Sequence, residues 1–214
     1  IKRYPTSSRE EIIQLAEQIE YSPQYSQGNK QAYKDLLLKI LGYEVTTSSS
    51  IRTIVSNLIF LLEIGVAEKD LGKIVTRLPA VLEYDIENTM KPKYDYIKEK
   101  GFNIEDIVFY PNLFGLSLIK RIIPRLEFLE IRGIKPLNYS LSRLLAPGDK
   151  EFAEKIAKSN YAEYQAFLHN LITKFSAEAK KPKGSSKLAL SEWHSFKEDF
   201  LNQYKGFRRN LELL

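Results

Sequence analysis

The chain has 214 residues, enough for one or two domains, and its composition is that of a globular protein, with 43% hydrophobic and 28% charged residues. It contains no cysteine, which excludes a disulfide scaffold and thiolate metal sites, and no apolar run long enough for a transmembrane helix. The net charge of +5 is compatible with contact to nucleic acid. The chain begins with Ile1 rather than Met, which is compatible with removal of a targeting segment.

The N-terminal segment, residues 1–43, predicts a pair of helices. Ser8 and Glu11 have the spacing of a capping box ahead of a first apolar face. Asn29 is placed to cap a second helix, which Gly42 ends. We expect this N-terminal helical cap to cover the open end of the helical array that follows, because exposed terminal faces of such arrays need covering.

The central segment, residues 44–158, contains a repeat. Three residues, Pro79, Pro92 and Gly101, recur 32 residues later as Pro111, Pro124 and Gly133. Between them, apolar columns spaced by four, four and three residues form the stripe of an amphipathic helix: Ile86/Leu118, Met90/Ile122, Tyr94/Leu126 and Ile97/Leu129. A period of this length predicts a helical solenoid, in which each repeat is a proline-led turn, a helix ended by glycine and a second short helix.

A less regular repeat precedes these two. We predict a helix over residues 50–64, ended by Gly65, with Ser56 in place of the second proline. A second helix is expected over residues 68–77. Together with a module that ends near Ala157, this makes three to four repeats.

The C-terminal segment, residues 159–214, departs from the repeat. Asp149 is placed to cap one helix with apolar residues from Phe152 to Leu171, and the basic Pro/Gly/Ser stretch 180–187 is typical of a linker. A further helix is then predicted with an aromatic face, which either folds back on the repeats or docks on a partner. Its residues are Trp193, Phe196, Phe200, Tyr204 and Phe207.

No pattern of catalytic or cofactor-binding residues is present in the sequence. The histidines, His169 and His194, lie in predicted helices without a second ligand at metal-binding spacing. No phosphate-binding glycine loop, nucleophile elbow or zinc-protease signature occurs. We therefore expect that the chain is no enzyme and uses no metal, cofactor, small-molecule substrate or membrane.

The repeat resembles the mTERF (mitochondrial transcription termination factor) family. The resemblance rests on the prolines and terminal glycines within residues 79–101 and 111–133, and on the Ser-Leu-Ser turn and acid-Lys-x-Phe helix within 136–157. It implies an all-α, right- or left-handed helical solenoid and a mitochondrial location, with the chloroplast as the alternative. It also implies a nucleic-acid ligand, either duplex DNA in transcription termination or ribosomal RNA.

Basic residues of the two clear repeats predict a nucleic-acid surface. Two columns are basic in both copies and lie on one flank of the helix, where stacked repeats would align them as a ladder for phosphates. These are Lys93, Lys100, Arg125 and Arg132, and the positive surface extends over Lys91, Lys98, Lys120, Arg121, Lys135 and Arg143. In the alternative interpretation these side chains cover the seam between repeats. Asn57 and Ile64, at the same columns of the less regular repeat, favour that alternative.

Three functions remain open from the sequence. We favour binding of ribosomal RNA, as a component or assembly partner of the mitochondrial ribosome. A short array with few cations suits folded RNA better than the ~34–36 Å of a duplex turn. The second is a duplex-DNA-binding regulator of organellar transcription. The third is a non-catalytic adaptor that docks through the C-terminal aromatic helix, with ribosomal proteins as candidate partners.

Overall fold

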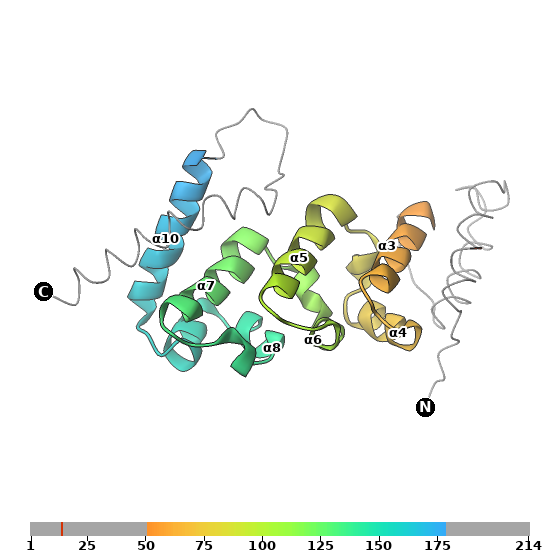
Figure 1. The fold of residues 1–214 in the computed structure, drawn as a ribbon. Helices are drawn as coiled ribbons and strands as arrows, with labels where there is room; N and C mark the ends of the chain where they lie inside the picture. Colours follow the sequence, from red (N-terminus) through yellow and green to blue (C-terminus); the bar gives the residue numbers. More distant parts are fainter. Residues whose placement is uncertain (1–13, 15–50, 179–214) are drawn as a thin grey trace, which may run out of the picture. The chain divides into compact units, whose positions relative to one another are not determined.

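The structure is a computed structural model that describes Gln14 and residues 51–178 (Figure 1). The predicted N-terminal cap, the basic linker and the C-terminal aromatic helix lie outside these described residues. Every regular element among the described residues is helical and none is a strand, which confirms the all-α prediction. None of the helices in this part of the chain is long and apolar enough to cross a membrane.

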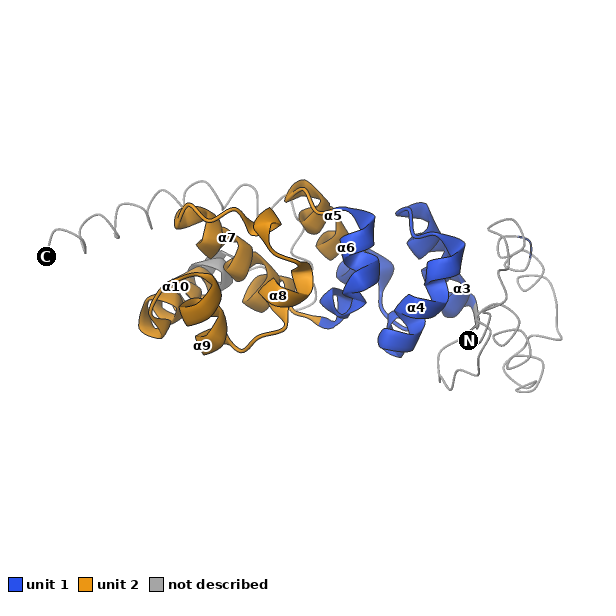
Figure 2. Cartoon of the chain, turned by 90° about the horizontal axis from the view of Figure 1, so that it is seen from below, with its two compact units in different colours: residues 1–90, 103–115 blue, residues 91–102, 116–214 orange. Residues whose placement is uncertain are grey.

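The described residues form two compact units, coloured separately in Figure 2. Unit 1 runs to Met90 and includes residues 103–115, whereas unit 2 holds residues 91–102 and those from Leu116 onward. The elements of unit 1 are α3 (Ile51–Glu63), α4 (Glu68–Arg77), the 3-10 helix η2 (Pro79–Leu82), the π-helix η3 (Ile86–Met90), α6 (Ile104–Phe109) and the 3-10 helix η4 (Pro111–Gly115).

The elements of unit 2 are likewise all helical where the structure describes them. They are α5 (Lys91–Glu99), the π-helix η5 (Leu118–Ile122), α7 (Ile123–Ile131), the 3-10 helix η6 (Pro136–Asn138), α8 (Leu141–Leu145), α9 (Asp149–Glu151), the π-helix η7 (Phe152–Ile156) and α10 (Tyr161–Glu178).

The period of the sequence is also the period of the helices. The π-helix η3 and helix α5 recur 32 residues later as η5 and α7, with matching first and last positions. Both proline-led turns, at Pro79 and Pro111, are 3-10 helices. The predicted helices of the less regular repeat are present as α3 and α4. The sequence therefore located the repeating unit correctly.

The terminal glycines end their helices in the same way. Gly65, Gly101 and Gly133 have φ of +102°, +88° and +72°, a region that glycine enters without strain. Each glycine N–H donates to the carbonyl three residues earlier, and the next N–H donates to the carbonyl five residues earlier. This is the Schellman arrangement, so the glycines are helix terminators, as the sequence predicted.

A π turn precedes each second proline, a detail that the sequence did not predict. Pro92 and Pro124 occupy the second position of α5 and α7. In an α-helix, the proline ring clashes with the carbonyl four residues earlier, and the wider π turn accommodates that carbonyl. Helix α3, with Ser56 at the equivalent position, is α-helical throughout Ile51–Glu63.

The prediction of one helix from Asp149 into the C-terminal segment is wrong. Helix α9 ends at Glu151, η7 continues it to Ile156, and α10 begins at Tyr161. Between them, Lys158 has φ of +53°, and it is the one non-glycine residue with positive φ in the described part of the chain. A helix cannot continue through a left-handed residue.

Each unit buries its own apolar core. In unit 1, α3 packs on α4 and η2, and α4 also packs on α6. The unit 1 core includes Ile54, Leu58, Leu61, Leu71, Ile74, Val75, Val81, Leu82, Ile107, Leu113 and Phe114. In unit 2, α7 lies against η5, α8 and α10. The unit 2 core includes Tyr96, Ile97, Ile122, Leu126, Phe128, Leu129, Leu144, Phe152, Tyr164, Phe167 and Leu171.

Candidate nucleic-acid interface

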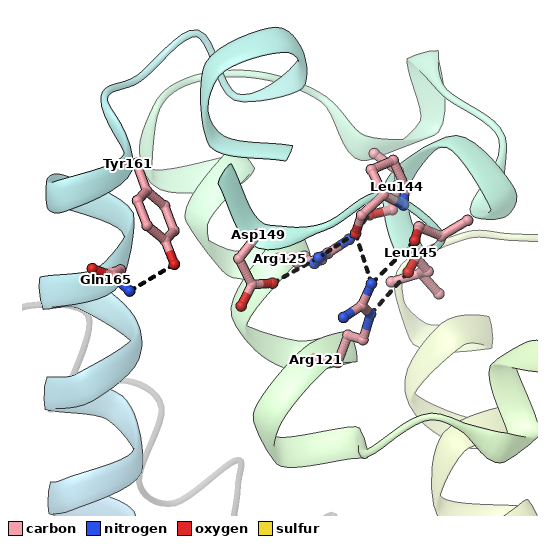
Figure 3. Close-up of polar contacts among 9 residues, drawn as sticks. Arg121, Arg125, Leu144, Leu145, Asp149, Tyr161 and Gln165 are labelled. Atoms are coloured by element: carbon pink, nitrogen blue, oxygen red, sulfur yellow. Dashed lines mark hydrogen bonds and ion pairs between the residues drawn. The ribbon is translucent and has the colours of Figure 1, made fainter. Parts of the chain in front are cut away.

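Arg125, which the sequence placed on a phosphate-binding surface, is fully buried in unit 2. Its Nη1 donates to the Leu144 carbonyl at 2.8 Å, and its Nη2 donates to the Pro147 carbonyl and to Asp149 Oδ1, both at 2.7 Å (Figure 3). The guanidinium also lies 4.8 Å from the centre of the Phe152 ring. The surface position predicted for Arg125 is therefore wrong, because its charge is matched inside the core.

Arg121, one turn earlier, binds the same stretch of backbone. Its Nε donates to the Leu145 carbonyl at 2.9 Å, and its Nη2 donates to the carbonyls of Ala146 at 3.2 Å and Pro147 at 2.6 Å (Figure 3). The last carbonyls of a helix have no donor within the helix. Arg121 and Arg125 together satisfy the carbonyls at the end of α8 and in the following turn.

Lys100 lies in the second basic column and is also enclosed. Its side chain is 5% exposed, and its Nζ lies 2.8 Å from Glu127 Oε1 and 2.7 Å from Glu130 Oε2. Burial lowers the pKa of Lys100, but the charges and hydrogen bonds of the two glutamates outweigh burial and raise the pKa overall. Tyr96 donates to Glu127 Oε1 at 2.8 Å, and burial raises the Tyr96 pKa well above its usual value, with the Glu127 charge adding to the rise. This cluster joins α5 to α7.

Arg132, the partner of Lys100 in that column, makes the corresponding joint one repeat later. Its Nη1 donates to both carboxylate oxygens of Glu163, at 2.9 and 3.0 Å. Its Nε and Nη2 donate at 2.8 Å to the carbonyls of Ala157 and Lys158. Since the side chains of Lys100 and Arg132 are committed within unit 2, the surface ladder predicted for this column is wrong.

Lys93 completes the first column, and it is 8% exposed. Burial lowers the pKa of Lys93 to about 8. Asn57, at the same column of the less regular repeat, is also buried and donates to the carbonyls of Val81 at 2.8 Å and Tyr84 at 2.9 Å. Asn57 and Arg125 thus play one role, donating to backbone carbonyls of a later turn. This column therefore has a structural role. The neutral Asn57 in the less regular repeat was the residue in the sequence that indicated it.

The other predicted contacts remain on the surface of unit 2. The exposed ones are Lys91, Lys98, Lys120, Lys135 and Arg143. Lys91 lies 3.4 Å from Asp95. Among the side chains that the structure describes, the other four have no carboxylate at salt-bridge distance. Their positive charges are thus uncompensated by the chain that the structure describes.

Two of these cations lie over aromatic rings. Lys98 Nζ is 5.6 Å from the centre of the Tyr94 ring, and the Arg143 guanidinium is 5.6 Å from the centre of the Tyr139 ring. Lys120 follows the hydrogen-bonded Ser117 cap of η5. It adjoins Arg121 in the chain, and Arg121 binds the end of α8, the helix that carries Arg143. The contact between Arg121 and α8 thereby joins η5, which carries Lys120, to α8, which carries Arg143.

A basic face on α4 was missed in the sequence analysis. Lys69, Lys73 and Arg77 follow one another at steps of four residues and are all exposed. That spacing was a readable signal, but it lies in the less regular repeat, outside the columns compared between the two clear copies.

The structure gives no sign of a metal centre in the residues it describes, where no group of three potential ligands occurs. His169, one of the two histidines, is exposed on α10. His194 and the predicted aromatic face from Trp193 to Phe207 lie beyond the described residues.

The family model named mTERF matches residues 13–153, more than half of the chain. The chain belongs to the mTERF family. As an mTERF protein it has the expected helical repeats, and the resemblance seen in the prolines and glycines is confirmed.

Three mTERF relatives of Arabidopsis thaliana are similar over the repeats. "Transcription termination factor MTERF2, chloroplastic" is 29% identical over 101 residues, 47% of this chain and 15% of that protein. "Transcription termination factor MTERF5, chloroplastic" is 31% identical over 97 residues, 45% of this chain and 19% of that protein. "Transcription termination factor MTERF15, mitochondrial" is 30% identical over 96 residues, 43% of this chain and 21% of that protein.

The mTERF chain therefore aligns with only 15% to 21% of the length of these relatives. Their names place them in chloroplasts or mitochondria, which agrees with the organellar location predicted for this chain.

Proposed function

We propose that this mTERF chain binds organellar RNA, with ribosomal RNA as the preferred ligand, as a component or assembly partner of the mitochondrial ribosome. The observation that carries the proposal is a set of surface cations in unit 2 that have no carboxylate partner among the described residues: Lys98, Lys120, Lys135 and Arg143. Such cations gain most from a polyanion, because each phosphate that they neutralise releases condensed counterions. The two columns Lys93/Arg125 and Lys100/Arg132 are therefore not proposed as RNA contacts. The four exposed residues are proposed in their place.

RNA is preferred to duplex DNA because of the two cation–aromatic pairs. Lys98 beside Tyr94 and Arg143 beside Tyr139 offer a positive charge next to an aromatic surface. In folded RNA, a cation can bind a phosphate while the neighbouring aromatic ring stacks on an unpaired base. The bases of a duplex are stacked on one another and do not offer a face to such a ring. The length of the array does not discriminate between the two ligands, because the relatives are several times longer than the matched segment.

Duplex DNA is the second candidate, and the names of the relatives support it. All three are called transcription termination factors. A DNA-binding regulator would use the same exposed cations on the phosphate backbone, so the two candidates differ in ligand rather than in surface.

The test is a charge-reversal variant with Lys98, Lys120, Lys135 and Arg143 changed to Glu. Fluorescence anisotropy at several salt concentrations would compare a structured ribosomal RNA fragment with duplex DNA. We expect weaker RNA binding and a salt slope reduced by about one for each lost phosphate contact. Circular dichroism should show an unchanged fold, since these side chains are exposed.

The matched control reverses two exposed lysines that are already paired. Lys91 lies near Asp95, and Lys155 lies 3.0 Å from Glu151. We expect Lys91→Glu with Lys155→Glu to change affinity less than the test variant. Equal RNA affinity of the test variant and the wild-type protein would refute the proposed surface. Tighter binding to duplex DNA than to RNA would favour the second candidate.

A docking role for the C-terminal aromatic helix remains part of the proposal. Phe200→Ala with Tyr204→Ala in the full chain should reduce co-sedimentation with ribosomal particles if this face docks on a ribosomal protein. Affinity for free RNA should stay constant. The adaptor hypothesis instead predicts a stoichiometric protein complex that survives nuclease treatment.

A further inference from the structure

Unit 1 carries an exposed aromatic side chain with an unusual neighbour. Phe109, the last residue of α6, is 64% exposed. A single exposed apolar residue needs no explanation by itself. Here, however, the guanidinium of Arg77 lies 5.5 Å from the centre of the ring. A planar cation and a solvent-facing ring are thus presented together.

Arg77 is held in place by the backbone of α6. Its Nη1 donates to the carbonyls of Val108 at 3.2 Å and Phe109 at 2.8 Å. These are carbonyls at the end of α6, which lack donors within the helix. Across the residues that the structure describes, no carboxylate lies at salt-bridge distance from Arg77. Its positive charge is therefore fixed beside the ring by carbonyls and has no carboxylate partner in the described part of the chain.

The exposed face of α4 leads to this ring. Lys69 and Lys73 precede Arg77 at steps of four residues, so the three side chains share one face of the helix. All three are exposed. Lys73 pairs with Asp70 at 2.5 Å, whereas Lys69 has no such partner among residues 51–178. A column of cations therefore runs along α4 to the Phe109 ring.

We propose that this face of unit 1 binds an unpaired nucleotide segment of RNA. One base stacks on the open face of Phe109, and the phosphates lie along Lys69 and Arg77, while Lys73 between them is paired with Asp70. The inference rests on the proposed RNA-binding function and names the kind of RNA and the residues that hold it. Every base has a flat face that stacks on an aromatic ring, but only a base outside a duplex can offer it.

The test uses the full chain and a short single-stranded RNA that carries the fluorescent base 2-aminopurine. Phe109→Ala should weaken binding roughly five- to 150-fold, the range expected for the loss of one stacked base. The salt slope should stay unchanged, because phenylalanine neutralises no phosphate. The quenching of 2-aminopurine that accompanies stacking should be lost in Phe109→Ala and kept in Phe109→Trp.

Two further variants separate stacking from charge and from general effects. Lys69→Ala should leave the quenching in place and lower the salt slope by about one. Leu137→Ala removes another exposed apolar side chain, 55% exposed and located in unit 2, and should leave affinity and quenching unchanged. Circular dichroism should report the wild-type fold for Phe109→Ala, since the ring is largely in water.

The possible results separate this site from the proposed function. A wild-type chain without affinity for any RNA would refute the proposed function, and the site with it. RNA binding that is equally tight in the wild type and in Phe109→Ala would refute the site alone. Loss of a protein partner from nuclease-treated Phe109→Ala complexes, with RNA affinity unchanged, would assign the face to that partner and overturn the nucleotide site.

Discussion

The guanidinium of Arg125 and the carboxylate of Asp149 lie 2.7 Å apart, with the arginine side chain wholly shielded from solvent. Burying the Arg125 guanidinium carries a large desolvation cost, which is offset only when hydrogen bonds satisfy its remaining donors, whereas the Asp149 side chain stays 34% exposed. The carbonyls of Leu144 and Pro147 supply such bonds to Nη1 and Nη2, whereas the buried Nε has no hydrogen-bond partner among the described residues. The joint is therefore most sensitive to the loss of Arg125, the donor that all of these bonds share.

Arg125→Met should destabilise the chain by roughly 3–5 kcal/mol, because it leaves the Asp149 carboxylate and the backbone carbonyls without their donor. The measurement is the free energy of unfolding in urea. Lys120→Met removes a nearby exposed cation and should change stability by less than about 0.5 kcal/mol. Equal stability of the two variants would contradict a structural role for Arg125.

Leu126→Ala and Leu129→Ala should each cost roughly 2–5 kcal/mol. Both leucines are fully buried in α7, at columns of the predicted apolar stripe. Chemical unfolding monitored by circular dichroism would measure the change, with the exposed Leu137→Ala as the control. Unfolding midpoints that hardly move in either core variant would contradict the burial seen here.

Lys158→Gly should raise the free energy of unfolding by roughly 0.5–1 kcal/mol. Lys158 has φ of +53°, and a left-handed conformation is costly for a residue with a Cβ atom. Thermal unfolding would show the gain. Lys155→Gly is the control, because glycine inside the helical segment η7 should lower stability by roughly 0.5–1 kcal/mol. A lower melting temperature for Lys158→Gly would contradict the strain argument.

Stability should rise with pH between about 8 and 10 because of Lys93. Its pKa is about 8 in the folded chain against 10.5 for an unperturbed lysine. Between these values the unfolded chain binds more protons, so the free energy of unfolding increases by at most about 1.4 kcal/mol per pH unit. Below pH 8 the cost of burying the charged lysine is fully present.

Lys93→Met isolates this effect. From pH 8 to pH 10 the free energy of unfolding should rise more in the wild type than in Lys93→Met, because the variant lacks the titrating group. In Lys91→Met, at an exposed lysine, it should rise as much as in the wild type. The series should stop near pH 10, because Tyr96 acts in the opposite direction above it. Burial raises the pKa of Tyr96, so deprotonation then favours the unfolded chain. A constant difference for Lys93→Met would refute the assignment.

The repeat could be predicted because the residues that begin and end its helices act through their own backbone conformation. Gly101 and Gly133 end helices through their own backbone freedom, and Pro79 and Pro111 begin turns through their fixed φ. The break at Lys158 could not be predicted, since neither glycine nor proline marks it.

The exposure of the basic residues was harder to predict, because the flank of an amphipathic helix is ambiguous. Whether a basic side chain there meets water or a neighbouring turn depends on packing that periodicity does not encode. Arg125 meets carbonyls, whereas Lys98 meets solvent. Asn57 was the informative residue, since a neutral amide in the same column can replace a donor but not a phosphate-binding cation.

The joints made by Asn57 and Arg125 are directed largely at main-chain carbonyls. A carbonyl is supplied by any amino acid, so the turn that receives the joint can change its side chains without losing the contact. Mutations can accumulate in such a turn while its attachment to the preceding helix persists. Individual repeats can therefore diverge in their surface side chains during evolution while the hydrogen bonds that hold the helices together are kept.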